Sequence, residues 1–270
     1  MSTNPTHDAP AAKPRNTDAR GGPSAALAGK TVLVTGAGRR IGAALARRFH
    51  AAGANVVLHY RSSGDDVAKL ARELDEIRPG TTALAQADIL DPTRLVPLAR
   101  AAAEAFGQLD VLVNNASTFY PTPIGEITES HWNDLVGTNL KAPLFLSQAA
   151  AAALRLTRGL ILNIADIHGM RPLRRYTTYS VAKAGLIMLT KSLARELAPH
   201  VRVNAIAPGP VMWPDEGTDK ELQRKIIDRT LLKRSGSADD VARAALFFAT
   251  EAPYVTGQIL AVDGGRSVGW

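Results

Sequence analysis

The chain has 270 residues, of which 46% are hydrophobic and 21% charged, and its formal net charge is +7. This composition is typical of a globular protein, and the length suffices for one large domain with a substantial core. No apolar run approaches the ~20 residues of a membrane helix, and the absence of cysteine excludes disulfides, thiolate catalysis and cysteine metal sites.

The first residues are rich in Pro, Ala, Asn and Thr, and they lack the apolar core of a secretory signal. We expect a disordered tail over 1–28 and a single domain over 29–270. A cytoplasmic location is the default expectation. Lys and Arg are spread along the chain without interleaved aromatics, which favours an anionic small-molecule site on a basic surface over nucleic-acid binding.

Short apolar segments alternate with amphipathic ones along the rest of the chain. Strands are expected at 30–36, 55–60, 81–88, 109–117, 159–165, 201–209 and 257–265. Helices are expected at 40–53, 65–79, 92–107, 129–154 and 177–199. This alternation is typical of a parallel sheet covered on both faces. The expected fold class is α/β: a Rossmann-type doubly wound parallel sheet flanked by helices on both faces, in a single domain.

The first expected strand runs directly into TGAGRRIG, at residues 35–42, which opens the first helix. Glycines let the backbone approach a pyrophosphate, and the helix N-terminus supplies unpaired N–H groups. This context favours dinucleotide binding over an ordinary strand-to-helix turn.

The end of the second strand indicates which dinucleotide is bound. An NAD site places an acid there for the ribose 2′-hydroxyl, whereas this chain reads HYRSS with no acid before Asp65. The guanidinium of Arg61, the hydroxyls of Ser62 and Ser63, and Arg39 from the glycine turn suit a phosphate dianion. We therefore predict NADPH, with a solvated loop role for Arg61 as the alternative.

Over residues 30–266 the chain resembles the short-chain dehydrogenase/reductase family. The shared motifs are the TG…G turn, Asp88, NNAS at 114–117, Asn139, the pair Tyr179 and Lys183, and PG at 208–209. The resemblance implies that Tyr179 is the general acid, that Lys183 lowers its pKa and holds the nicotinamide ribose, and that Asn139 positions a relay water. The pair lies four residues apart, so both side chains share one helix face.

Two residues depart from the common family pattern. Arg40 replaces a glycine, and Asp166 replaces a serine thirteen residues before Tyr179. That serine donates a hydrogen bond to an oxygen that becomes an alkoxide, which an ionised carboxylate would repel by several kcal/mol. Reduction of a C=N bond fits Asp166 in either state. Protonated, it could supply a proton through Tyr179; ionised, it could pair with a substrate that is cationic or carries N–H donors.

Both departures resemble the pteridine reductase branch, as do LHYRSS and NNASTFYPTP. The resemblance implies NADPH-dependent reduction of biopterin or a dihydropterin, with dihydrofolate as a further candidate. The pterin would lie between the nicotinamide and Phe119, with Arg40 and Ser117 near both ligands. The alternatives are a loop-packing role for Phe119 and a surface role for Arg40. Trp213 either lines the exit of the substrate side chain or packs a lid.

The expected site residues fall into three groups. The catalytic residues are Asn139, Asp166, Tyr179 and Lys183. The cofactor-binding residues are Gly36, Arg39, Arg40, Ile41, His59, Tyr60, Arg61, Ser62, Ser63, Asp88, Ile89, Asn115, Ala116, Ser117, Tyr179, Lys183, Pro208 and Gly209. The substrate-binding residues are Arg40, Ser117, Phe119, Asp166, Tyr179 and Trp213. No metal is expected, because His59 and His168 are too isolated.

Two other functions stay open. A short-chain carbonyl reductase for an oxo-acyl or sugar substrate is disfavoured by Asp166, and a non-catalytic NADPH-binding regulator would need neither a general acid nor its relay. Helices 129–154 and 177–199 carry more apolar surface than one sheet face requires. The family resemblance implies a homotetramer formed through them. The spread of basic residues and the lack of a long apolar run predict no nucleic-acid or membrane partner.

Overall fold

The computed structural model describes residues 25–211 and 219–269. One sheet of seven parallel strands has the order β3-β2-β1-β4-β5-β6-β7. The strands are β1 Thr31–Val34, β2 Asn55–Tyr60, β3 Thr82–Gln86, β4 Val111–Asn114, β5 Leu160–Ile164, β6 Arg202–Pro208 and β7 Ile259–Val262. The direction of strand succession reverses between β1 and β4. Ligands bind at such a switch point, beyond the carboxyl ends of the strands.

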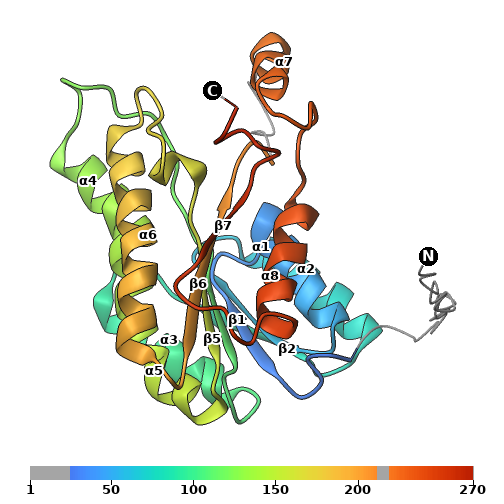
Figure 1. The fold of residues 1–270 in the computed structure, drawn as a ribbon. Helices are drawn as coiled ribbons and strands as arrows, with labels where there is room; N and C mark the ends of the chain where they lie inside the picture. The colour runs from blue at the N-terminus through green and yellow to red at the C-terminus, as the bar shows by residue number, and fades with distance from the viewer. Residues whose placement is uncertain (1–24, 212–218, 270) are drawn as a thin grey trace, which may run out of the picture.

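Helices cover both faces of the sheet (Figure 1). One face carries α1 Arg40–Ala51, α2 Gly64–Ile77 and α8 Ala238–Thr250. The other carries α3 Leu95–Glu104, α4 Glu129–Val136, α5 Ala142–Thr157 and α6 Thr177–Leu197. Three shorter turns are η1 Pro92–Arg94, η2 Gly137–Lys141 and η3 Ile167–Gly169, and α7 Lys220–Asp228 stands beyond the edge of the sheet. The predicted α/β fold class is confirmed.

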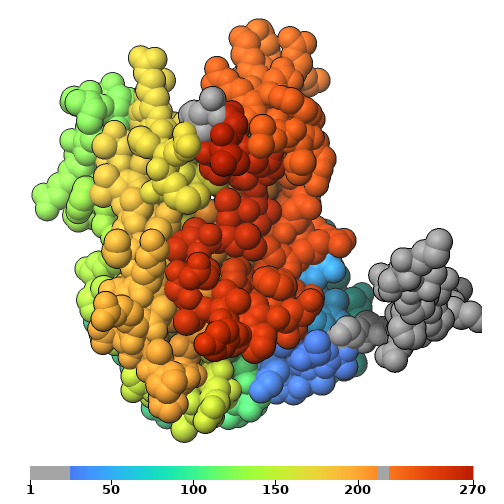
Figure 2. Space-filling view, in the orientation of Figure 1, coloured from blue at the N-terminus to red at the C-terminus, as the bar shows by residue number. Residues whose placement is uncertain are grey.

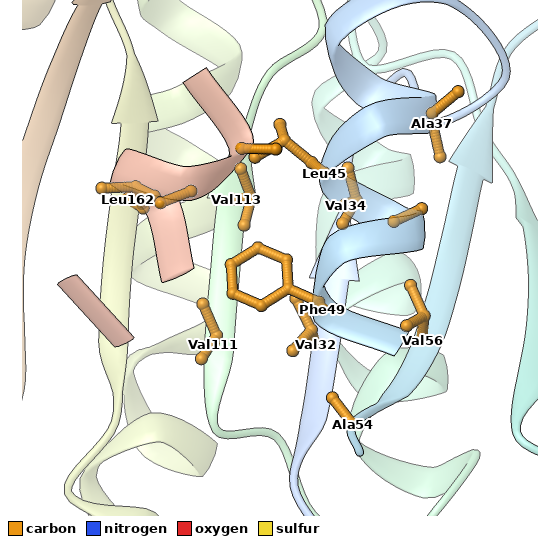
Figure 3. Close-up of a cluster of buried hydrophobic side chains, with 14 of the residues drawn as sticks. Val32, Val34, Ala37, Leu45, Phe49, Ala54, Val56, Val111, Val113 and Leu162 are labelled. Atoms are coloured by element: carbon orange, nitrogen blue, oxygen red, sulfur yellow. The ribbon is translucent and has the colours of Figure 1, made fainter. Parts of the chain in front are cut away.

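Each sheet face packs its own hydrophobic core. Successive side chains of a strand point to opposite faces, so Val32 and Val34 of β1 join the core under α1 while Leu33 joins the other. Figure 3 shows the ring of Phe49 from α1 beside Val111 of β4; this ring is fully buried. Burial on both faces explains why the strands read as continuous apolar runs.

The structure differs from the predicted elements in its helices: one is interrupted, and two, α7 and α8, were not predicted. The single helix predicted at 129–154 is interrupted by the π-helical turn η2, which contains Asn139. Helix α8 was missed, although its capping box of Ser237 and Asp240 is a recognisable start signal. Its buried residues Val241 and Phe248 pack on the α1 side of the sheet.

The folded part of the chain begins earlier than the predicted boundary at residue 29. Leu27 is buried, and its N–H donates to the carbonyl of Ala52 at 2.8 Å. Residues 1–24 lie outside the described residues, so disorder there stays a prediction. Within the described ranges, no helix is long and apolar enough to cross a membrane.

Candidate active site

The predicted site residues gather beyond the carboxyl ends of the strands. In the same region Figure 2 shows a hollow between the yellow segment that follows β5 and the orange and red segments near α7. Asp166 begins the turn η3 after β5, and α6 carries Tyr179 and Lys183 one turn apart. Three of the four expected catalytic side chains therefore come from two neighbouring elements.

Hydrogen bonds connect these three side chains to one another and to β5. The hydroxyl of Tyr179 donates to Oδ2 of Asp166 at 2.8 Å, and Oδ1 accepts the N–H of His168 at 2.8 Å. Lys183 is buried, and its Nζ donates to the carbonyl of Ile164 at 2.9 Å. Nζ lies 5.7 Å from the centre of the Tyr179 ring. Both oxygens of Asp166 thus act as acceptors, as a carboxylate requires.

Burial and charge set the ionisation of the pair in α6. Burial raises the pKa of Tyr179 well above its ordinary value, and the carboxylate of Asp166 raises it further. Burial lowers the pKa of Lys183 to about 8, against the opposing effect of Asp166. The lowering of the Tyr179 pKa by Lys183 stays a prediction, and burial and Asp166 act in the opposite direction. Tyr179 is held in its protonated form.

Gly169 lets η3 lie directly against α6. A β-carbon at this position would stand 2.7 Å from the backbone carbonyl carbon of Lys183, closer than real side chains approach. This contact brings the turn that starts at Asp166 up to the helix that carries Tyr179. Gly169 was not among the predicted site residues, and its signal in the sequence is a glycine three residues after Asp166.

Asn139 uses its side chain to hold the loop that follows β4. Its Nδ2 donates to the carbonyls of Leu135 at 2.9 Å and Thr118 at 3.0 Å, and its Oδ1 accepts the hydroxyl of Ser117 at 2.6 Å. The π turn displaces Asn139 from regular helical geometry and aims the amide at this loop. Its role with a relay water stays a prediction.

An aromatic cluster packs against the ring of Tyr179. Phe119, with 52% of its surface exposed, stacks on Tyr176 at 4.5 Å between ring centres, with 16° between the planes. Phe119 also meets Tyr179 edge to face at 4.8 Å. The N–H of Thr122 donates to the carbonyl of Arg175 at 2.6 Å, which joins the two loops. Tyr176 was missed by the sequence analysis, and its signal is a second aromatic three residues before Tyr179.

The glycine turn between β1 and α1 has the features of a dinucleotide cradle. Gly36 adopts a left-handed φ of 62°, and a β-carbon on Gly42 would overlap the Gly36 carbonyl oxygen. No side chain caps the N-terminus of α1, so its first N–H groups suit a phosphate. Arg40 has a φ of 52°, a backbone that glycine adopts most readily, and it stands where the family pattern has glycine. The residues present therefore fit a nicotinamide dinucleotide.

The region expected to hold the 2′-phosphate contains a neighbour that the sequence analysis did not include. Arg39 forms an ion pair with Asp66 in the first turn of α2. Arg61 and Ser62 are exposed just beyond β2, while Ser63 precedes α2. The residues expected around the phosphate thus lie in the segments that follow β1 and β2, and Arg39 already has an acidic partner.

The other predicted cofactor residues are distributed around the switch point. Asn115 donates through Nδ2 to the carbonyls of Thr35 at 2.8 Å and Gly36 at 3.1 Å. His59 is buried with both ring nitrogens bonded to backbone, one of them to the N–H of Gly36 in the glycine turn, so its imidazole has no nitrogen left for a cofactor. Ile41 lies in the first turn of α1. The remaining positions lie at the carboxyl ends of strands or in the loops that follow them: Tyr60, Asp88, Ile89, Ala116, Pro208 and Gly209. Trp213 lies outside the described residues. Among those described, no cluster of His, Asp or Glu could hold a metal ion.

Known proteins match this chain in sequence and in fold over most of their length. A family model described as "Enoyl-(Acyl carrier protein) reductase" matches residues 36–267. The chain is 36% identical to pteridine reductase 1 of Leishmania tarentolae, over 87% of this chain and 96% of that protein. It is 37% identical to 3beta-hydroxysteroid dehydrogenase 1 of Eggerthella lenta, over 90% and 95% respectively. A solved structure, a blue fluorescent protein from a metagenomic library in complex with NADPH, superposes with a TM-score of 0.84 at 34% identity. That superposition covers 89% of this chain and 98% of the other.

Proposed function

The chain belongs to the short-chain dehydrogenase/reductase family and is an NAD(P)-dependent oxidoreductase, and we propose that it reduces a C=N bond of a pterin with NADPH. The substrate class is biopterin or a dihydropterin, with dihydrofolate as a further candidate. The similarity to a pteridine reductase supports this choice, since it spans most of both chains.

One contact carries the proposal: the hydrogen bond from Tyr179 to Asp166. A carbonyl substrate develops negative charge on oxygen at this point, and a carboxylate beside it would oppose that charge. A C=N bond instead receives its proton on nitrogen, and a pterin offers N–H donors to a carboxylate. Asp166 is therefore better suited to a nitrogen-rich ring than to a ketone.

Each residue of the site has a separate role in the proposed reaction. Bound NADPH supplies the hydride. Tyr179, kept protonated by burial and by Asp166, donates the proton to the substrate nitrogen. Asp166 is half-buried and can return a proton to Tyr179 from solvent. Lys183 holds the nicotinamide ribose, and Phe119 offers a flat surface on which a pterin ring stacks.

NADPH is proposed over NADH on the charge at the end of β2. The residues after this strand include Arg61 and two hydroxyls, with Arg39 across from them, and no acid occupies the position that favours NAD. The solved relative, which is in complex with NADPH, is consistent with this preference.

Absorbance at 340 nm tests the substrate assignment directly. Purified protein and NADPH are mixed with dihydrobiopterin, biopterin, dihydrofolate and a panel of ketones, and each is repeated with NADH. Pterin turnover that falls at least about a hundredfold in Asp166→Ala, but not in the exposed carboxylate variant Glu104→Gln at the end of α3, is the expected result. Turnover of ketones alone would replace the proposal with a carbonyl reductase.

A carbonyl reductase is the second candidate because one relative of similar identity is a hydroxysteroid dehydrogenase. The ketones in the same assay distinguish the two. A non-catalytic regulator is disfavoured, since Tyr179 and Lys183 retain the geometry that proton donation needs.

We also propose a homotetramer that uses α4, α5 and α6. These helices expose large apolar side chains, which in a monomer would face water: Trp132, Phe145, Val181 and Met188. Burial of such side chains between copies removes apolar area from water and stabilises association. Size-exclusion chromatography with light scattering is expected to give the tetramer mass, and a monomer at micromolar concentration would contradict it.

A further inference from the structure

His59 is a buried side chain that links two structural elements next to the glycine turn. It lies in β2 with 2% of its surface exposed. Its Nδ1 accepts the N–H of Gly36 at 3.2 Å, and its Nε2 lies 3.1 Å from the carbonyl of Ala87, just beyond β3. An N–H can only donate and a carbonyl can only accept, so these partners require a neutral imidazole with its hydrogen on Nε2.

Gly36 is held by hydrogen bonds at both its carbonyl and its N–H. Its carbonyl accepts a hydrogen bond from Nδ2 of Asn115 at 3.1 Å, and its N–H donates to Nδ1 of His59. The backbone continues the same attachment, because the N–H of Ala37 donates to the carbonyl of His59 at 2.9 Å. The left-handed turn at Gly36 is therefore fixed between β4 and β2, immediately before the helix N-terminus that faces the pyrophosphate.

We propose that His59 is a positioning residue for the nicotinamide dinucleotide, which it aids by fixing the Gly36 turn rather than by touching the cofactor. With both nitrogens engaged, the imidazole has none left for a ligand. Loss of the Gly36 bond frees the turn to sample other directions, and N–H groups that must be ordered on binding hold a phosphate less tightly. The inference depends only on dinucleotide binding, so it stands or falls independently of the pterin proposal.

The surroundings of His59 maintain the form that this role requires. Burial lowers the pKa of His59 to about 4, while the bond to Ala87 and the carboxylate of Asp88 act in the opposite direction. The neutral acceptor form consequently dominates near neutral pH. Protonation of Nδ1 would place the imidazole N–H and the Gly36 N–H opposite each other, two donors with no acceptor between them.

Two substitutions of His59 each keep one of the two imidazole hydrogen bonds and remove the other. In His59→Asn, the amide oxygen takes the place of Nδ1 and can accept from Gly36, but the side chain is too short for Ala87. In His59→Gln, the longer amide can reach Ala87 but leaves Gly36 without its acceptor. The measurements are the NADPH Kd from fluorescence titration, the KM for NADPH, kcat at saturation, and the Tm of the protein without cofactor.

We expect His59→Gln to raise the NADPH Kd about tenfold, the effect of one unsatisfied buried N–H, with kcat at saturation nearly unchanged. His59→Asn is expected to stay within about threefold of the parent Kd, although both variants lower Tm. His50→Gln is the matched control. His50 is also buried and pairs with the hydroxyl of Thr81 at 2.8 Å, away from the turn, so its loss should lower Tm alone.

A parallel rise in Kd for Asn and Gln, or no rise in either, would overturn the proposal and leave His59 as a stabilising residue only. If both variants fail to fold, the unaltered protein still decides the question. Long-range ¹H–¹⁵N NMR of the imidazole should show hydrogen on Nε2 and a hydrogen-bonded Nδ1, with the Gly36 amide slow to exchange in the NADPH complex. An Nδ1–H tautomer, or a fast-exchanging Gly36 amide in that complex, would reject it.

Discussion

The hydroxyl of Tyr179 donates to the carboxylate of Asp166 at 2.8 Å, two side chains thirteen positions apart in the chain. In a site built with serine, the equivalent group would donate a hydrogen bond to the substrate. Here the acidic neighbour accepts one, and it raises the pKa of Tyr179. Under the proposed function, this reversal of hydrogen-bond direction is what distinguishes the site from that of a ketone reductase.

Substitution of Asp166 by serine should therefore exchange one activity for another. We expect Asp166→Ser to lower kcat/KM for a dihydropterin at least about a hundredfold, since general acid assistance contributes about 10² to 10⁴. Reduction of an activated ketone should rise at the same time. Steady-state rates for both substrates test this, with Asp166→Asn as the control that keeps the shape without the charge. A pterin rate unaffected by serine would show that the carboxylate takes no part.

The ion pair between Arg39 and Asp66 should weaken NADPH binding. Asp66 places a negative charge near the expected 2′-phosphate and competes for the guanidinium. Exposed ion pairs contribute about 0.2 to 1 kcal/mol, so Asp66→Asn should tighten the NADPH Kd by a factor between about 1.4 and 5 and leave the NADH Kd unchanged. Titrations at two salt concentrations measure this. Glu73→Gln, which breaks the exposed pair with Arg47, is the control; weaker NADPH binding in Asp66→Asn would reverse the assignment.

A methyl group at Gly169 should disturb the junction of η3 and α6. Its β-carbon would press on the backbone of Lys183, and overpacking of this kind costs about 1 to 3 kcal/mol. Gly169→Ala is expected to lower both the free energy of unfolding and kcat, since Asp166 moves with the turn. Urea unfolding and initial rates measure the two effects. At Gly64, by contrast, a β-carbon meets only an ordinary contact at 3.4 Å, so Gly64→Ala should not destabilise the fold.

The stability of the fold should depend on pH through His59. Its pKa is about 4 in the folded protein and about 6.5 in an unfolded chain, so the unfolded chain binds a proton first as pH falls. The free energy of unfolding should therefore drop between pH 6.5 and 4, by about 3 kcal/mol in total from this group. Urea titrations of the parent and His59→Asn should give a stability difference that shrinks across this range. A constant difference would contradict the prediction.

The sequence alone determined the features that depend on short stretches of chain. Hydrophobic periodicity predicted the alternating strands and helices, because burial on one face or two leaves a local pattern. The glycine turn was recognisable since a left-handed backbone and close helix packing need glycine. The spacing of Tyr179 and Lys183 placed both on one face of α6, and Asp166 stood out because its charge opposes the usual chemistry.

Only the tertiary structure decided which distant groups meet. It joined Asp166 to Tyr179, paired Arg39 with Asp66, and turned His59 inward to Gly36. Such contacts depend on the order of the strands in the sheet and on the face from which each side chain leaves its strand. A shift of one residue in a strand moves a side chain to the opposite face, and motif spacing carries no information about that choice between distant segments.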